Sequence, residues 1–191
     1  MTDLPVLECP TAADWERWLE THHPDSPGVW LKFAKKGAPA AHTTVTHAEA
    51  LETALCFGWI DGQIRSHDAT FFLQRFTPRR PRSRWSQINR QAAEALIAAG
   101  RMRPPGQAQV EAAQRDGRWE RAYEPQSRAT VPEDLRRALD GDPEARAFFE
   151  TLTGARRYAF LHRLHHVTSP EARSKRIAGY IELLRNRRTL N

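Results

Sequence analysis

The chain has 191 residues, which fits one domain of ordinary size or one domain with a helical appendage. With 40% hydrophobic residues, 27% charged residues and six Trp, we expect a folded core and a heavily solvated exterior rather than disorder. The net charge of +6 comes mainly from 25 Arg against 4 Lys. Arginine suits carboxylate and phosphate ligands, but the excess is equally explained by a biased genomic base composition.

Two lone cysteines, Cys9 and Cys56, are far apart in the chain and lack metal-ligand spacing. Unpaired cysteines are typical of a reducing compartment. The N-terminal segment carries no basic stretch followed by an apolar one. No window of the sequence is apolar over the roughly 18 residues that a membrane-spanning helix needs. We therefore expect a cytoplasmic protein without membrane insertion.

The first helix is predicted to begin after Thr11, which has the partner Asp14 of a capping box. Apolar residues then alternate over Val29–Ala34, as in a half-buried strand. A second capping box, Thr46 with Glu49, predicts another helix.

A β-hairpin is predicted from Trp59–Arg65 and Thr70–Phe76, joined by four residues. Gly62 indicates a bulge or the close approach of another backbone. Because a lone hairpin is marginally stable, we expect Val29–Ala34 to complete a mostly antiparallel sheet of about three strands.

After the hairpin, proline restricts residues 77–82 to non-helical backbone, and helices follow to the end of the chain. Cap residues and prolines predict them to begin near residues 83 or 86, 104, 132, 143, 154 and 169. The fold class is therefore α+β and mostly helical. We expect an α+β domain over 1–117 and a C-terminal helical segment over 118–191, packed together as one globular unit, with a hinge candidate in 116–130.

The strongest candidate site is the segment Arg75–Arg90, which contains six Arg, one Trp and no acid. A helix start beside arginines favours anions, and an exposed Trp stacks on rings. The candidate ligand-binding residues here are Arg75, Arg79, Arg80, Trp85 and Asn89. The alternative is a solvated basic loop whose Trp packs inward while its arginines pair with acids elsewhere.

A second candidate lies on the first hairpin strand, where alternation places Trp59, Asp61, Gln63 and Arg65 on one face. A half-buried carboxylate needs a partner, and the arginine-rich segment is the expected source. Such a pair serves a polar ligand pocket, a general acid/base with a tuned pKa, or equally a structural salt bridge between loop and sheet.

The remaining sequence patterns give weaker evidence of a functional site. Among His162, His165 and His166, the spacing places two imidazoles on one helix face, as in zinc-binding helices. Such helices usually add a third ligand and often a catalytic Glu, and no HExxH occurs, so no metal is expected. No Gly-rich phosphate loop or GxGxxG occurs, so no cofactor is expected. A basic stripe on the last helix is usually a solvated face, with nucleic acid as the alternative partner: Arg173, Lys175, Arg176, Arg185, Arg187 and Arg188.

The motifs Cys56–Gln63 and Phe76–Asn89 together resemble the YdeI/OmpD-associated, or bacteriocin-protection, family. The similarity continues through Ala98–Met102, Gly106 and Trp119, and through the helical segment 132–184. The resemblance implies a role in survival under antimicrobial-peptide stress and a link to an outer-membrane porin, with no established reaction.

Three functions remain open. The first is a non-enzymatic stress-protection protein that binds an anionic ligand or protein partner through the arginine-rich segment and Asp61. The second is a nucleic-acid-binding protein that uses the same arginines and the C-terminal basic stripe. The third is an enzyme of unrecognised type that acts on a small anionic substrate near Asp61.

Overall fold

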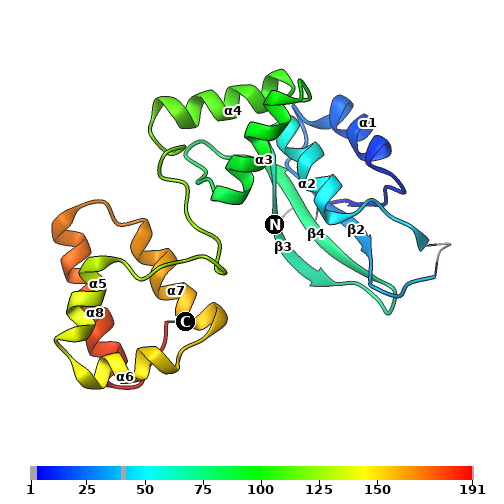
Figure 1. Cartoon of the computed structure of the whole chain (residues 1–191). Helices are drawn as coiled ribbons and strands as arrows, with labels where there is room; N and C mark the ends of the chain where they lie inside the picture. The colour runs from blue at the N-terminus through cyan, green and yellow to red at the C-terminus, as the bar shows by residue number, and fades with distance from the viewer. Residues whose placement is uncertain (1–3, 40–41, 191) are drawn as a thin grey trace. The chain divides into compact units, whose positions relative to one another are not determined.

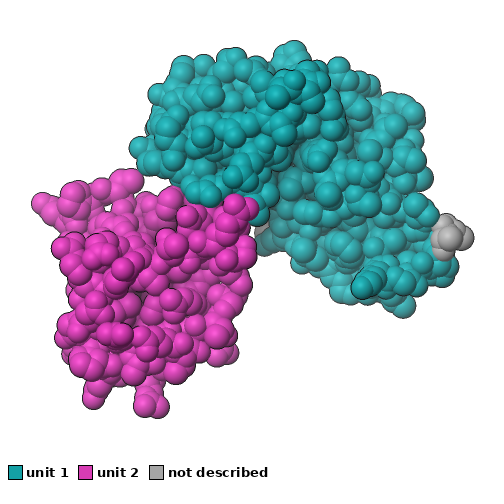
Figure 2. All heavy atoms as spheres, viewed as in Figure 1, with its two compact units in different colours: residues 1–122 teal, residues 123–191 magenta. Residues whose placement is uncertain are grey.

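The computed structural model describes residues 4–39 and 42–190 of the chain. Within these residues it contains eight helices and one four-stranded sheet, which confirms an α+β, mostly helical fold (Figure 1). Contacts within the chain divide it into two compact units, residues 1–122 and 123–191 (Figure 2). In the described part of the chain, no helix is long and apolar enough to cross a membrane.

Unit 1 contains the sheet and four helices, in an order close to that predicted. Its elements are β1 (Val6–Leu7), α1 (Ala12–His22), β2 (Val29–Ala34), α2 (His47–Cys56), β3 (Trp59–Ser66), β4 (Phe71–Pro78), α3 (Gln87–Ala98) and α4 (Pro104–Arg115). Thr11 and Thr46 form the predicted capping boxes: each hydroxyl accepts the backbone N–H of the acidic residue three positions later, and each threonine N–H donates to the carboxylate of that residue. Ser86, rather than Ser83, caps α3.

The sheet has the strand order β1-β2-β4-β3. β2, β4 and β3 pair antiparallel, as predicted, whereas β1 adds a fourth strand parallel to β2. This strand was not predicted because two residues are too short for a recognisable alternation. The register of β3 on β4 shifts between Asp61 and Ile64, at the glycine for which a bulge was predicted.

One face of the sheet forms the core of unit 1, beneath α1 and α2 (Figure 1). Val29 and Phe76, which are paired across β2 and β4, are both fully buried. Trp15 of α1 packs edge-on against Phe76 and Trp59, with ring centres 5.6 and 6.3 Å apart. Its indole N–H donates to the carbonyl of Ala50 at 3.1 Å, so the core ties α1 to α2 as well as to the sheet.

Two glycines allow α4 to cross the end of α2 closely. Gly58 has φ +72°, a left-handed conformation that ends α2. At Gly106 of α4, a side-chain Cβ would lie 2.3 Å from the carbonyl oxygen of Cys56. A larger residue at either position would therefore separate the two helices.

Unit 2 is helical and has a hydrophobic core of its own. Its elements are α5 (Glu133–Asp140), α6 (Pro143–Thr151), α7 (Gly154–His165) and α8 (Pro170–Arg185). Leu135, Phe160, Leu164 and Leu184 are fully buried at its centre. The unit therefore has the interior expected of an independent packing unit.

Two ion pairs connect the helices of unit 2. Arg173 of α8 forms a forked pair with Asp134 of α5 and also donates to the carbonyl of Leu164. Arg185 of α8 pairs with Asp142, which caps α6 by accepting the N–H of Ala145 at 3.0 Å. Two members of the predicted basic stripe are thus structural, because each side chain joins α8 to a neighbouring helix.

Candidate functional site

The arginine loop, which we define as residues 79–86 between β4 and α3, has an internal support. Arg79 is only 5% exposed, and its guanidinium lies 3.6 Å from the centre of the Trp85 ring. Arg79 Nη1 also donates to the carbonyl of Arg84 at 3.1 Å. Trp85 is 2% exposed and packs edge-on against Trp119, with ring centres 4.8 Å apart. Both predicted ligand contacts, Arg79 and Trp85, therefore lie inside the unit.

A second arginine holds the loop from outside. Arg118 Nη1 donates to the carbonyl of Ser83 at 2.6 Å, while its Nε bonds to Asp116 at 2.8 Å. The N–H of Ser83 in turn donates to the carbonyl of Arg80 at 2.9 Å, which closes a turn. Arg82 takes φ +66° in this turn, a conformation that a non-glycine residue adopts only when its surroundings impose it.

This support presents three guanidinium groups to solvent, those of Arg80, Arg82 and Arg84. Within residues 4–39 and 42–190, none of the three has a carboxylate at ion-pair distance. Arg90, in the first turn of α3, does pair with an acid, Glu94, at 2.9 Å. The alternative in which all the arginines pair with acids is therefore not what the structure contains.

The prediction that Trp59, Asp61, Gln63 and Arg65 share one sheet face is wrong. Trp59 and Asp61 do face the same way, since they pair with Pro78 and Phe76. The bulge after Asp61 inserts backbone that shifts the alternation, so Arg65 emerges on the opposite face. There its guanidinium lies 4.2 Å from the centre of the Trp30 ring.

Each remaining candidate on β3 and α3 has a distinct setting. Trp59 is buried, and its indole N–H donates to the carbonyl of His23 at 3.3 Å. Gln63 is exposed. Asn89 is half-buried in the first turn of α3, where its backbone N–H donates to the Ser86 hydroxyl at 3.2 Å. The three side chains therefore differ in exposure, from the buried Trp59 to the exposed Gln63.

Asp61 has a partner that was not predicted. Its carboxylate, 26% exposed, lies 3.1 Å from Nε2 of His47, the first residue of α2. His47 also lines an open cavity of about 430 Å³, whose walls include Phe33, Phe72 and Lys36. No local pattern in the sequence indicates this pair, because its two residues lie on different elements. The carboxylate therefore belongs to an Asp–His pair beside a cavity, and not to a pair with the arginine loop.

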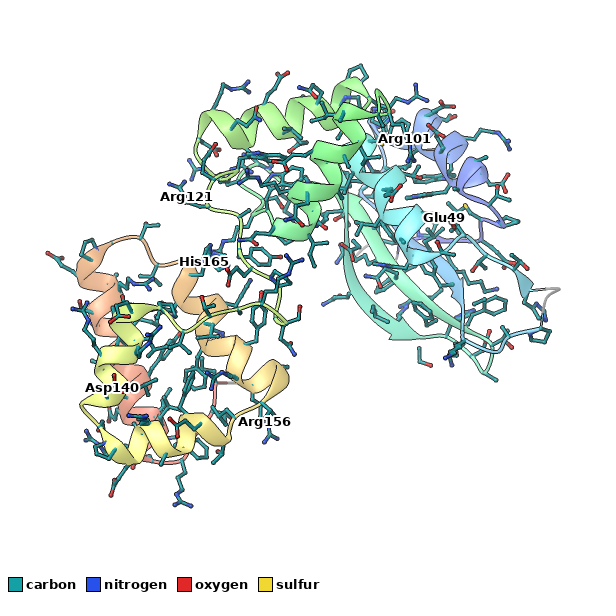
Figure 3. All side chains as sticks on the ribbon, in the orientation of Figure 1. Glu49, Arg101, Arg121, Asp140, Arg156 and His165 are labelled. Carbon is teal, nitrogen blue, oxygen red and sulfur yellow. The ribbon has the colours of Figure 1, made fainter. Side chains whose placement is uncertain are left out.

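The exposed charges of unit 1 are not confined to the loop. Figure 3 shows the side chains of Glu49 and Arg101 on the helical side of the unit. Arg101 pairs with Glu52 at 3.0 Å and Arg103 pairs with Glu16 at 2.9 Å. These arginines differ from the exposed loop arginines because each one has a carboxylate partner.

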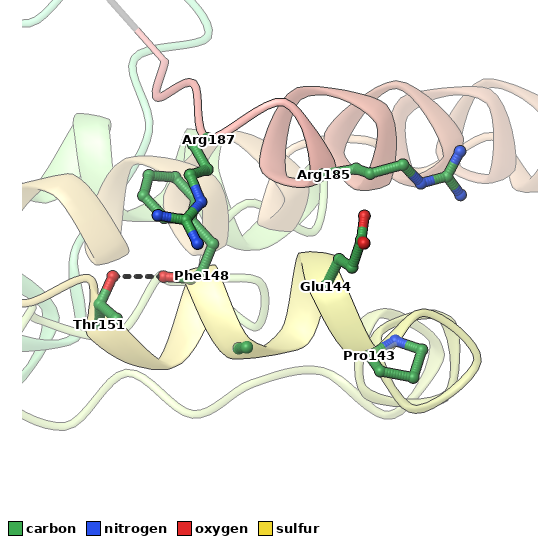
Figure 4. Close-up of a pocket in the computed structure, with 7 residues that line it drawn as sticks. Pro143, Glu144, Phe148, Thr151, Arg185 and Arg187 are labelled. Atoms are coloured by element: carbon green, nitrogen blue, oxygen red, sulfur yellow. Dashed lines mark hydrogen bonds between the residues drawn. The ribbon is translucent and has the colours of Figure 1, made fainter.

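In unit 2, a groove of about 610 Å³ lies between α6 and the end of α8 (Figure 4). Phe148 and Ala147 provide apolar walls, and Glu144, Arg185 and Arg187 provide charges of both signs. The Thr151 hydroxyl donates to the carbonyl of Phe148 at 2.6 Å, so it closes the turn of α6. The groove thus lacks the single-sign charge of the arginine loop.

His162 of α7 and His166, which directly follows that helix, belong to an aromatic cluster. Nε2 of His162 lies 3.1 Å from Nε2 of His166, and the ring of Tyr123 contacts both imidazoles edge-on. Over residues 4–39 and 42–190, no three His, Cys, Asp or Glu side chains are grouped as metal ligands would be.

Family models match both parts of the chain. A model described as a domain of unknown function, DUF8412, matches residues 7–109, more than half of the chain. The chain belongs to this family. A second model, described as bacteriocin-protection, YdeI or OmpD-associated, matches residues 128–187.

The second match confirms the resemblance predicted from sequence and gives its extent. It covers the C-terminal helical segment and not nearly the whole chain. The motifs Cys56–Gln63 and Phe76–Asn89, from which the resemblance was predicted, lie in the DUF8412 range. No curated protein and no solved structure matches the chain.

Proposed function

We propose that this DUF8412 protein is a stress-protection protein of the bacteriocin-protection type that binds an anionic ligand or partner through its arginine loop. In this proposal Arg80, Arg82 and Arg84 contact the anion. Arg79 and Trp85 hold the loop in shape and do not touch the ligand. The observation that carries the proposal is a loop held by the Arg79–Trp85 contact and by Arg118, with three exposed guanidinium groups that have no carboxylate partner among the described residues.

The physical basis is preorganisation. A flexible arginine loses conformational freedom when it grips an anion, and this cost reduces affinity. Here the backbone of the loop is already fixed by the Arg79–Trp85 stack and by the hydrogen bond of Arg118 to Ser83. Charge-assisted, forked hydrogen bonds to phosphate or carboxylate would then form at a lower entropic cost.

The first test is protection in cells. Bacteria that express the wild-type chain are compared with bacteria that express Arg80→Ala/Arg82→Ala/Arg84→Ala, and survival is counted after exposure to a cationic antimicrobial peptide. A matched control, Arg17→Ala/Arg101→Ala/Arg115→Ala, removes three exposed arginines that have carboxylate partners. We expect the loop variant to lose protection and the control variant to keep it.

A binding measurement complements survival. Inorganic polyphosphate, an anion without further chemistry, is titrated into the purified full chain and into both triple variants. Because the variants lower the net charge equally, a weaker affinity of the loop variant alone would assign the anion to the loop. Equal affinities of the two variants, or full protection by the loop variant, would contradict the proposal.

A further inference from the structure

The sheet of unit 1 has a second face, away from α1 and α2, which we call the outer face. The register places Trp30 and Arg75 directly opposite each other on this face. Lys32 lies two residues further along β2, and Arg65 projects from β3 on the same side after the bulge. These residues come from three adjacent, hydrogen-bonded strands, so they form one patch.

The patch combines an aromatic ring with guanidinium groups. Arg65 reaches across β4 to stack on Trp30, with its guanidinium carbon 4.2 Å from the ring centre. Arg65 itself is exposed, and Trp30 is half-buried. The pair therefore places an exposed guanidinium directly over an aromatic ring on this face. Guanidinium planes and aromatic rings are the groups on which unpaired bases stack.

Arg75 adds a cation with unused hydrogen-bonding capacity. Its Nε is buried and has no hydrogen-bond partner among the described residues. Lys32 does have a partner, since its Nζ lies 2.8 Å from the carboxylate of Glu8. Of the charges placed on this face, Arg65 and Arg75 therefore remain without a carboxylate at ion-pair distance in the part of the chain described. Such a face repels cations and favours an anion.

We propose that the outer face of the sheet, with Trp30, Arg65 and Arg75 at its centre, binds single-stranded nucleic acid. A chain of phosphates satisfies the two uncompensated arginines, and its unpaired bases stack on the Arg65–Trp30 pair. A duplex presents its phosphates but keeps its bases paired and stacked on one another. It can therefore contact the arginines but cannot stack its bases on the Arg65–Trp30 pair. The binding surface is separate from the arginine loop, and the inference does not depend on the proposed loop function.

The test uses the full chain and fluorescently labelled oligothymidylate of about 15 nucleotides, a length that spans a typical single-strand site. Anisotropy is measured across a salt series, with a duplex of the same length for comparison. We expect the single strand to bind more tightly than the duplex at every salt concentration. Equal affinities, or no binding of the single strand at low salt, would overturn the proposal.

Two variants separate stacking from charge. Trp30→Ala should weaken single-strand binding about tenfold, the usual effect of removing one stacking platform. Arg65→Ala/Arg75→Ala should reduce the slope of log affinity against log salt by about 1.4, because each single-strand phosphate contact contributes about 0.7. The control Arg17→Ala/Arg115→Ala changes the net charge equally at arginines that pair with acids. Equal losses of affinity in the outer-face and control variants would show that binding depends only on net charge, and would overturn the proposal.

Inorganic polyphosphate separates the contribution of base stacking from that of charge. The loop variant shows whether the arginine loop or the outer face binds the single strand. Trp30→Ala should bind inorganic polyphosphate as the wild type does, since polyphosphate has no bases to stack. Arg80→Ala/Arg82→Ala/Arg84→Ala should retain the preference for single strands. If that variant alone abolishes oligothymidylate binding while the face variants bind normally, the loop and not the sheet is the site. Circular dichroism shows whether each variant is folded. If Trp30→Ala does not fold, the proposal is tested with Arg65→Ala/Arg75→Ala alone.

Discussion

The guanidinium of Arg79 lies 3.6 Å from the centre of the Trp85 ring, and both side chains are buried beneath the arginine loop. A cation in this position is stabilised by the ring and by the carbonyl of Arg84. The pair therefore connects the interior of unit 1 to the shape of its most basic segment. Loss of either side chain should affect stability first and binding only through the loop's shape.

We expect Trp85→Ala to lower the free energy of unfolding of unit 1 by about 3–5 kcal/mol, the usual cost of truncating a buried Trp. Arg80→Ala, on the exposed side of the same loop, should change it by less than about 0.5 kcal/mol. Urea denaturation followed by circular dichroism measures both. A loss of similar size in the two variants would mean that the stack does not support the loop.

The crossing of α2 and α4 gives a prediction about glycine. Gly106→Ala would place a Cβ 2.3 Å from the carbonyl oxygen of Cys56, so the helices must separate. We expect a loss of about 2–4 kcal/mol, in the range of a strained and overpacked core position. The melting temperature of unit 1 should fall accordingly.

A matched control for this substitution lies in α8. Gly179 is also helical, but its Cβ would meet nothing within 4 Å. Gly179→Ala should stabilise unit 2 by about 0.5–1 kcal/mol, because alanine loses less backbone entropy than glycine in a helix. If both substitutions destabilise the protein equally, close packing at Gly106 is not the cause.

Much of the fold could be predicted because its signals are local. Thr11 and Thr46 each cap a helix by hydrogen bonding with the residue three positions later. In the C-terminal half, a helix begins at or directly after each proline from which a helix start was predicted. The pairing of β1 with β2 could not be predicted, since it depends on contacts between segments that the whole of α1 separates in the chain.

The candidate site was harder to predict than the fold. The sequence shows the cluster of arginines. The alternation of side chains along β3, however, does not show that a bulge places Arg65 on the opposite face of the sheet. Trp85 packs against Trp119, and Ser83 of the loop is held by Arg118, two residues that follow only after α3 and α4 along the chain. The pair of Asp61 with His47 is likewise a product of tertiary packing.

The two thiols should resist modification in the folded protein. Burial raises the pKa of Cys9 to about 11, and the nearby carboxylates of Asp14 and Glu8 contribute to the rise. Burial also raises the pKa of Cys56. Because the thiolate is the reactive form, a thiol reagent at pH 8 should label the native protein slowly and the unfolded protein quickly. Rapid labelling of either cysteine in the native state would contradict the buried positions.

The ion pairs of unit 2 should make its stability depend on pH in the acid range. The hydrogen bond and charge of Arg173 hold the pKa of Asp134 below its ordinary value of 3.8. The N–H of Ala145, followed by Arg185, lowers the pKa of Asp142 in the same way. A lowered pKa in the folded state means that the stabilisation is complete above the unfolded value. It is lost as the pH falls through the folded value.

Asp134→Asn removes one of these carboxylates and tests the direction of the effect. At neutral pH we expect the variant to melt at a lower temperature than the wild type, because Arg173 then lacks its charged partner. As the pH falls below the ordinary value of 3.8 and then through the lower pKa of the folded state, the wild-type carboxylate becomes protonated and the two melting temperatures should converge. A substitution of the exposed Glu133, whose pair with Arg136 spans 3.6 Å, should leave the curve almost unchanged. A difference between wild type and Asp134→Asn that persists or grows at low pH would show that Arg173 and Asp134 stabilise the unit by shape rather than by charge.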